Sequence, residues 1–178
     1  MTKRLIAIIV IVLLVATVFV GCGKAATGDT KMGFGSVTTI AKSANAAADA
    51  DGKVQSYTEL ACVVIDKDGK IVNVWIDAIQ ANVAFDATGT IKTDLATQVK
   101  TKRELGDDYG MKAKSALGKE WWEQADSLEK YLIGKTKADV QAIKMTEGKA
   151  ADSDLSSTVS VTVSNYLAAV VEAIDNAQ

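Results

Sequence analysis

Apolar side chains occupy alternate positions from Val72 to Ile76 and define one face of a predicted strand over residues 71–78. A run rich in β-forming residues covers 56–66, and Asp68-Gly69 lies between the two runs. Asp and Gly tolerate the positive φ that a tight hairpin turn requires. The pattern therefore predicts an antiparallel hairpin whose apolar face is covered by other elements.

Further β segments flank this hairpin on both sides. Residues 33–40 end in β-branched side chains and predict a first strand, whereas the Ala- and Asp-rich residues 42–53 predict a surface segment whose second half is a loop. After the hairpin, residues 82–85 and 90–92 are separated by the turn-forming residues 86–89. This arrangement predicts a second, short hairpin.

Beyond residue 116 the apolar period changes to that of a helix. Gly134 follows the first stripe and predicts its C-terminal cap, and Thr136 predicts the N-cap of a short helix that runs through Ile143. The first stripe consists of Leu117, Trp121, Ala125, Leu128 and Leu132.

The last stripe predicts a helix from about Ser157 to Ala173, with a β-strand over 159–164 as the alternative for its β-branched beginning. Together these elements predict an α+β fold, in which an antiparallel β-sheet built from hairpins packs against C-terminal helices. The last stripe consists of Leu155, Val159, Val163, Leu167, Val170 and Ile174.

The N-terminal segment has the pattern of a secretion signal. Basic residues precede the apolar run from Leu5 to Val20, which is shorter than the roughly 20 residues that span a bilayer. The residues Phe19-Val20-Gly21-Cys22 resemble a bacterial lipobox, in which the cysteine is acylated. We therefore expect residues 1–21 to be a signal peptide and Cys22 to be lipidated. The alternative is an uncleaved anchor helix.

This interpretation divides the chain into three parts. After the signal peptide, residues 22–31 are the lipid-anchored cysteine and a flexible linker, and residues 32–178 are a single domain. Stable attachment needs two or more acyl chains, which a diacylglycerol on Cys22 supplies. The predicted location is the extracytoplasmic face of a bacterial cell membrane.

Composition narrows the possible functions. The 178 residues are 48% apolar, and 20 basic side chains against 22 acidic ones give a net charge of −2. This balance lacks the basic field of a nucleic-acid-binding protein. The sequence has no histidine, which excludes Ser-His-Asp catalysis and His-ligated metals. With Cys22 acylated, Cys62 has no cysteine left to pair with and is expected to be a buried thiol.

Hydroxyl side chains crowd the segment 154–164 to an unusual degree for the entry of a helix. This segment resembles the C-terminal motif of FMN-binding-domain proteins, exported flavoproteins in which a flavin transferase links FMN through its phosphate to a Thr or Ser. In this resemblance Asp154 takes the acidic position and Ser157 the first Ser. Ser160 is then the flavin-accepting hydroxyl and Thr162 the downstream hydroxyl. Thr158 and Val159 stand where the family has Gly and Ala.

The resemblance implies covalent FMN on Ser160, with a flavin transferase and a redox partner as interacting proteins. A phosphate on Ser160 would lie at the N-terminus of the predicted helix, where unpaired N–H groups favour an anion. Trp122 and Tyr109 are the candidates for covering the flavin ring. Trp121 lies on the apolar stripe and is expected in the core, and Tyr166 is a further aromatic candidate.

The predicted function is that of a membrane-anchored extracytoplasmic FMN-binding lipoprotein that takes part in electron transfer. The cofactor would then carry the redox step, so we expect an electron carrier or binding protein rather than a turnover enzyme. The alternative is a flavin-less surface lipoprotein that binds a small molecule or a protein. Residues 103–112 and 118–125 also look like lipoproteins of anaerobic Gram-positive bacteria.

Overall fold

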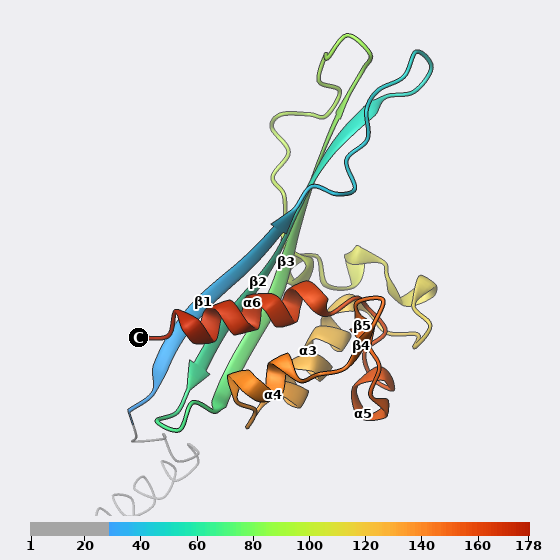
Figure 1. Cartoon of the computed structure of the whole chain (residues 1–178). Coiled ribbons are helices and arrows are strands. Elements are labelled where there is room, and N and C mark those ends of the chain that lie inside the picture. Colours follow the sequence, from blue (N-terminus) through green and yellow to red (C-terminus); the bar gives the residue numbers. More distant parts are fainter. Residues whose placement is uncertain (1–28) are drawn as a thin grey trace, which may run out of the picture.

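The structure, a computed structural model, describes residues 29–178. The predicted signal peptide, Cys22 and most of the linker lie outside the described residues. A three-stranded antiparallel sheet in the order β1-β2-β3 forms one layer, and the helices gather on one side of it (Figure 1). This architecture confirms the predicted α+β fold. The strands of the sheet are β1 (Lys31–Thr39), β2 (Gly52–Ile65) and β3 (Ile71–Phe85).

The remaining elements follow the sheet in the chain. They are α2 (Lys102–Leu105), the 3₁₀ helices η1 (Gly106–Tyr109) and η2 (Lys112–Lys114), α3 (Trp121–Leu132), α4 (Lys137–Gln141), the two-stranded sheet of β4 (Met145–Thr146) and β5 (Lys149–Ala150), α5 (Ser153–Ser156) and α6 (Ser164–Asp175).

The turn between β2 and β3 forms as its sequence predicts. Gly69 adopts a φ of 74°, and the backbone N–H of Asp66 donates to the carbonyl of Lys70 at 2.9 Å. The Asp66 carboxylate also accepts from the backbone N–H groups of Asp68 and Lys70, each at 2.9 Å. These bonds lower the pKa of Asp66 and fix the register of the hairpin.

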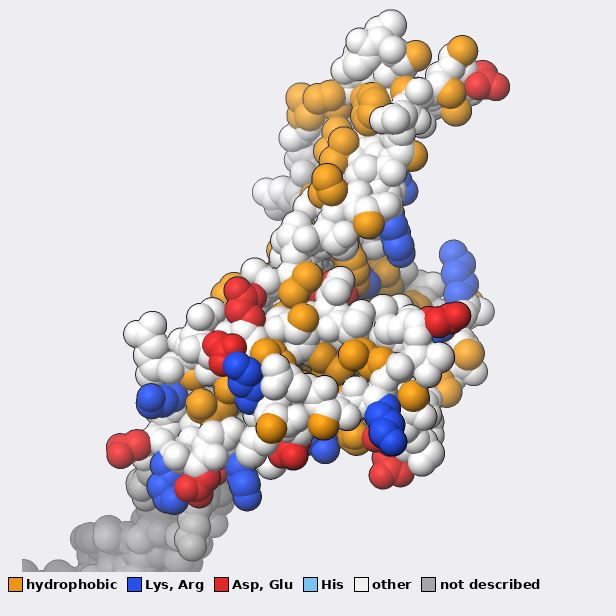
Figure 2. Space-filling view, in the orientation of Figure 1, with side chains coloured by type: hydrophobic (Ala, Val, Ile, Leu, Met, Phe, Trp, Pro, Cys, Tyr) orange, Lys and Arg blue, Asp and Glu red, His pale blue; other side chains and the backbone are white. Residues whose placement is uncertain are grey.

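The predicted second hairpin over 82–92 forms, although it is short: the backbone N–H of Asp86 donates to the carbonyl of Thr90 at 3.0 Å, and Phe85 pairs with Ile91 in an antiparallel bridge. Residues 82–85 are also the end of β3, which extends past the predicted strand 71–78, and they pair with the beginning of β2 at 52–55. The returning chain joins β3 through the bridge at Phe85 and through two hydrogen bonds at Ala84. The Ala84 carbonyl accepts from the backbone N–H of Lys92 at 2.8 Å, and its backbone N–H donates to the Thr93 hydroxyl at 2.8 Å. The far ends of β2 and β3, with the adjoining loops, therefore project as an arm away from the helices (Figure 1). Hydrophobic side chains lie exposed along this arm, including Ile40, Val54, Ile91 and Leu95 (Figure 2).

The core lies between the inner face of the sheet and helices α3 and α6 (Figure 1). Four of the five positions in the first predicted stripe are buried on α3, and Leu117 precedes the helix. Thr136 caps α4 through a capping box with Asp139, as predicted, although α4 ends at Gln141. The largest fully buried side chains include Trp121, Leu128, Leu132, Val63, Ile71 and Ile76.

The last helix begins at Ser164, which corrects the prediction of a start near Ser157. Residues 157–163 form neither a helix nor a strand, although Val159 and Val163 are buried as the stripe requires. β-Branched side chains lose rotamer freedom in a helix. In addition, the carbonyl of Gly148 accepts from the backbone N–H groups of Val163 and Ser164, at 2.7 and 3.2 Å. This segment is therefore anchored to the β4-β5 turn.

Helix α6 lies directly against β1. A Cβ atom added at Gly33 or Gly35 would lie 1.9 Å from the Ala173 carbonyl or 2.1 Å from the Ala169 carbonyl. The helix also satisfies the free edge of β1, since Glu172 accepts from the backbone N–H of Ser36 at 2.8 Å. Edge strands with unpaired backbone groups invite aggregation. This helix protects the edge.

We expect Gly35→Ala to destabilise the fold, because its methyl group cannot fit without displacing α6. Overpacking of this kind costs about 1–3 kcal/mol of unfolding free energy. Urea denaturation of the variant and of Ser36→Ala provides the measurement and its control, since the Ser36 side chain is exposed. Equal stability of Gly35→Ala and the parent chain would contradict the close contact between α6 and β1.

Candidate functional site

A cavity of about 390 Å³ opens between the inner face of the sheet and the C-terminal helices. Its size lies within the usual range for small-molecule sites, roughly 300–1,000 Å³. Four aromatic residues, three lysines and one glutamate contribute to its lining. These residues are Tyr57, Tyr109, Trp121, Tyr166, Lys42, Lys102, Lys149 and Glu59.

Lys102 is buried among aromatic rings on one side of the cavity. Its ammonium lies 4.7 Å from the ring centres of Tyr57 and Tyr109 and 5.2 Å from that of Trp121. The ammonium also donates to the Tyr57 hydroxyl at 2.7 Å. Cation–π contacts of this geometry stabilise a desolvated charge. Burial nevertheless lowers the pKa of Lys102 to about 8.

Two tyrosine hydroxyls continue the polar network from Lys102. The hydroxyl of Tyr57 lies 2.7 Å from that of Tyr166, and the Tyr166 ring packs against Trp121 with 5.9 Å between ring centres. Burial raises the pKa of both tyrosines. Both therefore remain protonated at neutral pH. The network holds one wall of the cavity rigid, because each hydroxyl is fixed by a neighbour.

Glu59 is the buried carboxyl group of the cavity. It is 2% exposed, and its Oε2 atom has no hydrogen-bond partner among the described residues. Burial raises the pKa of Glu59, and this rise is opposed by a hydrogen bond from Asn165 and by the charges of Lys102 and Lys42. A buried polar atom without a partner costs about 1–3 kcal/mol. Such a group in a cavity indicates a binding site more than a stabilising contact.

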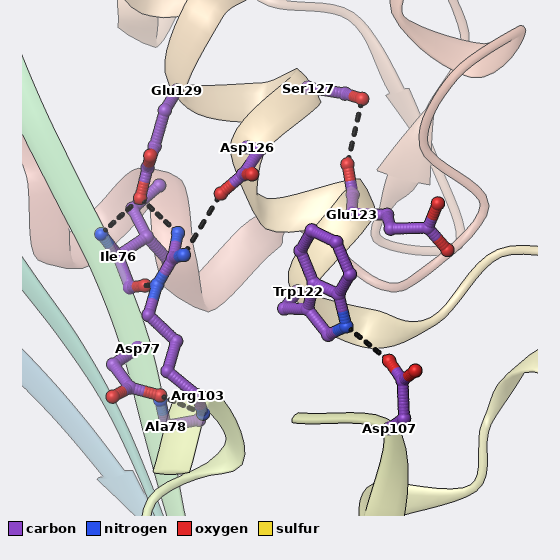
Figure 3. A network of polar contacts seen from close by, with 10 residues as sticks. All are labelled: Ile76, Asp77, Ala78, Arg103, Asp107, Trp122, Glu123, Asp126, Ser127 and Glu129. Atoms are coloured by element: carbon purple, nitrogen blue, oxygen red, sulfur yellow. Dashed lines mark hydrogen bonds and ion pairs between the residues drawn. The ribbon is translucent and has the colours of Figure 1, made fainter. Parts of the chain in front are cut away.

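Arg103 holds α2 in the position that brings Lys102 into the cavity. Its guanidinium donates to the carbonyl of Ile76 on β3 and to Asp126 and Glu129 on α3 (Figure 3). The bond lengths to Ile76 and Asp126 are 2.7 and 2.9 Å. Two neighbouring residues of α2 thus have different partners. Arg103 binds α3, whereas Lys102 lies among the aromatic rings of the cavity.

Ser160 is held at the cavity by Gln124, which is fully buried on α3. The Gln124 Oε1 atom accepts from the backbone N–H of Ser160 at 2.8 Å and from its hydroxyl at 3.2 Å, and it also lies 3.3 Å from the backbone N of Val161. The Gln124 amide donates to Ser115 at 3.1 Å. This one side chain therefore fixes the otherwise irregular segment that carries Ser160.

The cavity brings together three of the predicted site residues, Ser160, Thr162 and Tyr109. Asp154 and Ser157 are exposed and do not line the cavity, and the Ser157 hydroxyl donates to the Asp154 carbonyl at 3.1 Å. The predicted position of Ser160 at a helix N-terminus is wrong, since α6 begins four residues later.

The aromatic residues at the cavity differ from those favoured by the sequence. Trp122 lies outside the cavity, and its Nε1–H donates to Asp107 at 2.9 Å (Figure 3). Trp121, which the stripe assigns to the core, is buried and also lines the cavity, together with Tyr166. The helical period places Trp121 on the inner face correctly, but it does not show that the inner face borders a hollow.

Sequence reasoning missed three residues of the site. Glu59 stands at an inward position of β2, next to the buried apolar residues Ala61 and Val63 on the same face, and Gln124 stands on the apolar face of α3. A polar residue on an apolar face is a signal that could have found both. Lys102 gives no such signal, because its helix has only four residues.

The fold and the cavity thus define an α+β protein with an aromatic-walled cavity that contains charged side chains. No family model matches the chain, and no solved structure matches it. A chlorophenol reductase from Desulfitobacterium hafniense is 61% identical over 41 residues, which cover 23% of this chain and 12% of that protein. Within residues 29–178, no helix is long and apolar enough to cross a membrane.

The lowered pKa of Lys102 predicts a specific pH dependence of stability. Between pH 8 and about 10 the unfolded chain binds a proton that the folded chain has released, so the unfolding free energy increases with pH. Above this range the raised pKa values of Tyr57 and Tyr166 act in the opposite direction. We expect Lys102→Met to lose the increase, which is on the order of 1 kcal/mol.

Urea denaturation at pH 7.5, 8.5 and 9.5 measures this effect. Lys130→Met serves as the control, since Lys130 is exposed on α3 and lies outside the cavity. A parallel pH dependence in the parent chain and in Lys102→Met would show that Lys102 keeps its ordinary pKa in the fold.

Proposed function

We propose that this protein is an FMN-binding electron carrier, with FMN linked through its phosphate to Ser160. The observation that carries the proposal is that Ser160 lines the same cavity as four aromatic residues and a buried cation. The cavity offers what a flavin requires, namely an attachment point, planar apolar walls and polar groups at defined positions.

The residues present fit each part of the cofactor. Lys149 and Lys42 line the cavity and can balance the charge of a phosphate on Ser160, which replaces the helix N-terminus expected from the sequence. Lys149 is also close to the attachment segment, since its backbone pairs with Thr162. Aromatic side chains such as Trp121 and Tyr109 provide surfaces against which a planar ring packs.

Bound FMN would supply the redox chemistry, and the chain would orient it and limit its access to water. Gln124 contributes through its Oε1 atom, which accepts from the backbone N–H groups of Ser160 and Val161, because these bonds do not need the hydroxyl hydrogen that attachment of FMN removes. The network of Lys102, Tyr57 and Tyr166 keeps the opposite wall from collapsing. Because these groups act by position, the absence of histidine is no obstacle to the function.

The location of the protein is part of the same proposal. Acylation of Cys22 would attach the chain to the extracytoplasmic face of a bacterial membrane, and the linker would leave the domain free to meet a redox partner. The described domain begins with β1 at Lys31, shortly after that linker. A flavin transferase would load the cofactor at this location.

The similarity to a chlorophenol reductase does not enter the proposal. The match spans 41 residues and covers 12% of that protein, so its activity is not extended to this chain. The proposal depends on the residues of the cavity and on the resemblance of residues 154–162.

Flavinylation of the full chain tests the proposal. After co-expression with a flavin transferase and purification in detergent, we expect the intact mass to increase by one FMN less one water. Flavin fluorescence should survive denaturation in a gel. Ser160→Ala should abolish both signals, because it removes the only proposed acceptor oxygen.

Ser36→Ala is the matched control, since Ser36 is exposed on β1 and lies outside both the motif and the cavity. It should be flavinylated like the parent chain. An unmodified parent chain, obtained beside a known substrate that the same transferase does modify, would refute the covalent attachment. Modification that persists in Ser160→Ala would move the attachment to another residue.

A flavin-less interaction module is the second candidate, and the projecting arm favours it. The arm extends far from the core and exposes the side chains of Ile40, Val54, Ile91 and Leu95 (Figure 2). Isolated two-stranded hairpins are marginally stable in water. Contact with another protein would shield this surface. This candidate gains weight if the flavinylation experiment gives an unmodified chain.

A further inference from the structure

We propose that Glu59 and Lys102 recognise the imide edge of the flavin, the part of the ring in which one N–H group lies between two carbonyl groups. This inference rests on the proposed FMN function and specifies which end of the ring system enters the cavity. It assigns a specificity-determining role to two residues that the flavinylation motif does not include.

The unpartnered oxygen of Glu59 provides the first half of the argument. Its Oε2 atom is fully buried and has no hydrogen-bond partner among the described residues, and the Glu59 residue, which is 2% exposed, lines the cavity. Because a carboxylate oxygen can only accept, the missing partner must be a donor. The imide N–H is the ring donor of oxidised flavin, so it matches the unfilled acceptor.

Lys102 provides the second half. Its ammonium has three donors, and the described contacts use one of them in a hydrogen bond to Tyr57. The aromatic rings around it bind the charge but accept no ordinary hydrogen bond. The remaining donors can therefore bind a carbonyl oxygen, and the flavin imide has one on each side of its N–H.

The separation of the two charges explains why a ligand is needed between them. Glu59 and Lys102 line the same cavity, and the charge of each contributes to the pKa of the other. Yet within residues 29–178 no ion pair joins them. A ligand edge with adjacent donor and acceptor can bridge such a pair. The methylated benzene edge of the flavin has neither group, and it would leave Glu59 without a partner.

A pair of flavin analogues tests this orientation. Lumiflavin carries the imide N–H, whereas 3-methyllumiflavin carries a methyl group on the same nitrogen. Binding of each to the full chain, made without a flavin transferase and purified in detergent, is measured by flavin fluorescence titration. We expect lumiflavin to bind at least about tenfold more tightly, since a hydrogen bond to a charged group contributes about 1.5–3 kcal/mol.

Glu59→Leu separates the hydrogen bond from simple lack of space. Leu is similar in bulk but accepts no hydrogen bond, so the preference for lumiflavin should fall to near one. A preference that persists in Glu59→Leu would show that the methyl group is excluded by another wall, and it would overturn the role of Glu59. Gln80→Leu is the matched control, because Gln80 lines the same cavity and should keep the preference.

Lys102→Met is the last variant. It should weaken the binding of both analogues by a similar factor, because both retain the ring carbonyls.

If circular dichroism shows that Glu59→Leu does not fold, Glu59→Gln replaces it. The neutral amide oxygen is a weaker acceptor, so the preference should shrink but not vanish. An unchanged preference in Glu59→Gln would also overturn the inference.

The outcomes also separate this inference from the proposed function. Equal binding of the two analogues by the parent chain, with FMN still attached at Ser160, would refute the orientation alone. Failure of the parent chain to bind either analogue or to accept FMN would refute the flavin function and this inference with it.

Discussion

The close contact between α6 and β1 is the constraint on which the rest of the structure depends. Gly33 and Gly35 have no side chains, so at these two positions of β1 the backbone of α6 can lie directly against the strand. The same helix then carries Tyr166 and Asn165 to the inner face of the sheet. A larger residue on β1 would push α6 outward and remove one wall of the cavity. Two glycines in an edge strand thus determine where the binding site can form.

The second feature that determines the cavity is the different role of two neighbouring residues of α2, Lys102 and Arg103. Arg103 donates hydrogen bonds to β3 and to α3, and it thereby clamps α2 to both elements. Its neighbour Lys102 then points the other way and is desolvated, and its aromatic surroundings compensate for only part of the cost. A four-residue helix is too short to be stable alone. The clamp therefore explains how so short an element can hold a buried charge.

The sequence predicts those parts of the fold whose determinants are local. The turn at Asp68-Gly69 depends on backbone conformation, the α4 cap depends on Thr136 and Asp139, and the α3 stripe depends on a simple period. The same patterns fail over 157–163, where buried valines at helical spacing occur without a helix. There the backbone donors bind the carbonyl of Gly148, and only the tertiary structure brings that carbonyl near.

The sequence predicts only part of the candidate site. The hydroxyl-rich segment located Ser160 and Thr162, and a resemblance rather than a physical rule gave them a role. Lys102 could not be found, because its burial arises from rings on three different elements. Glu59 left a trace in the sequence as a carboxylate among inward-facing apolar residues. That trace indicates burial but not the empty space beside it.

The cavity is where the molecule departs from the arrangement that would make it most stable. A buried carboxylate lacks a partner on one oxygen, and a buried lysine has its pKa lowered to about 8. An apolar pair of similar volume would remove both costs. Proteins retain such groups mainly where a ligand completes the missing contacts, because stability and function then favour different residues. The two unfavourable groups lie in one cavity with Ser160, and this coincidence is the strongest physical reason to regard it as a binding site.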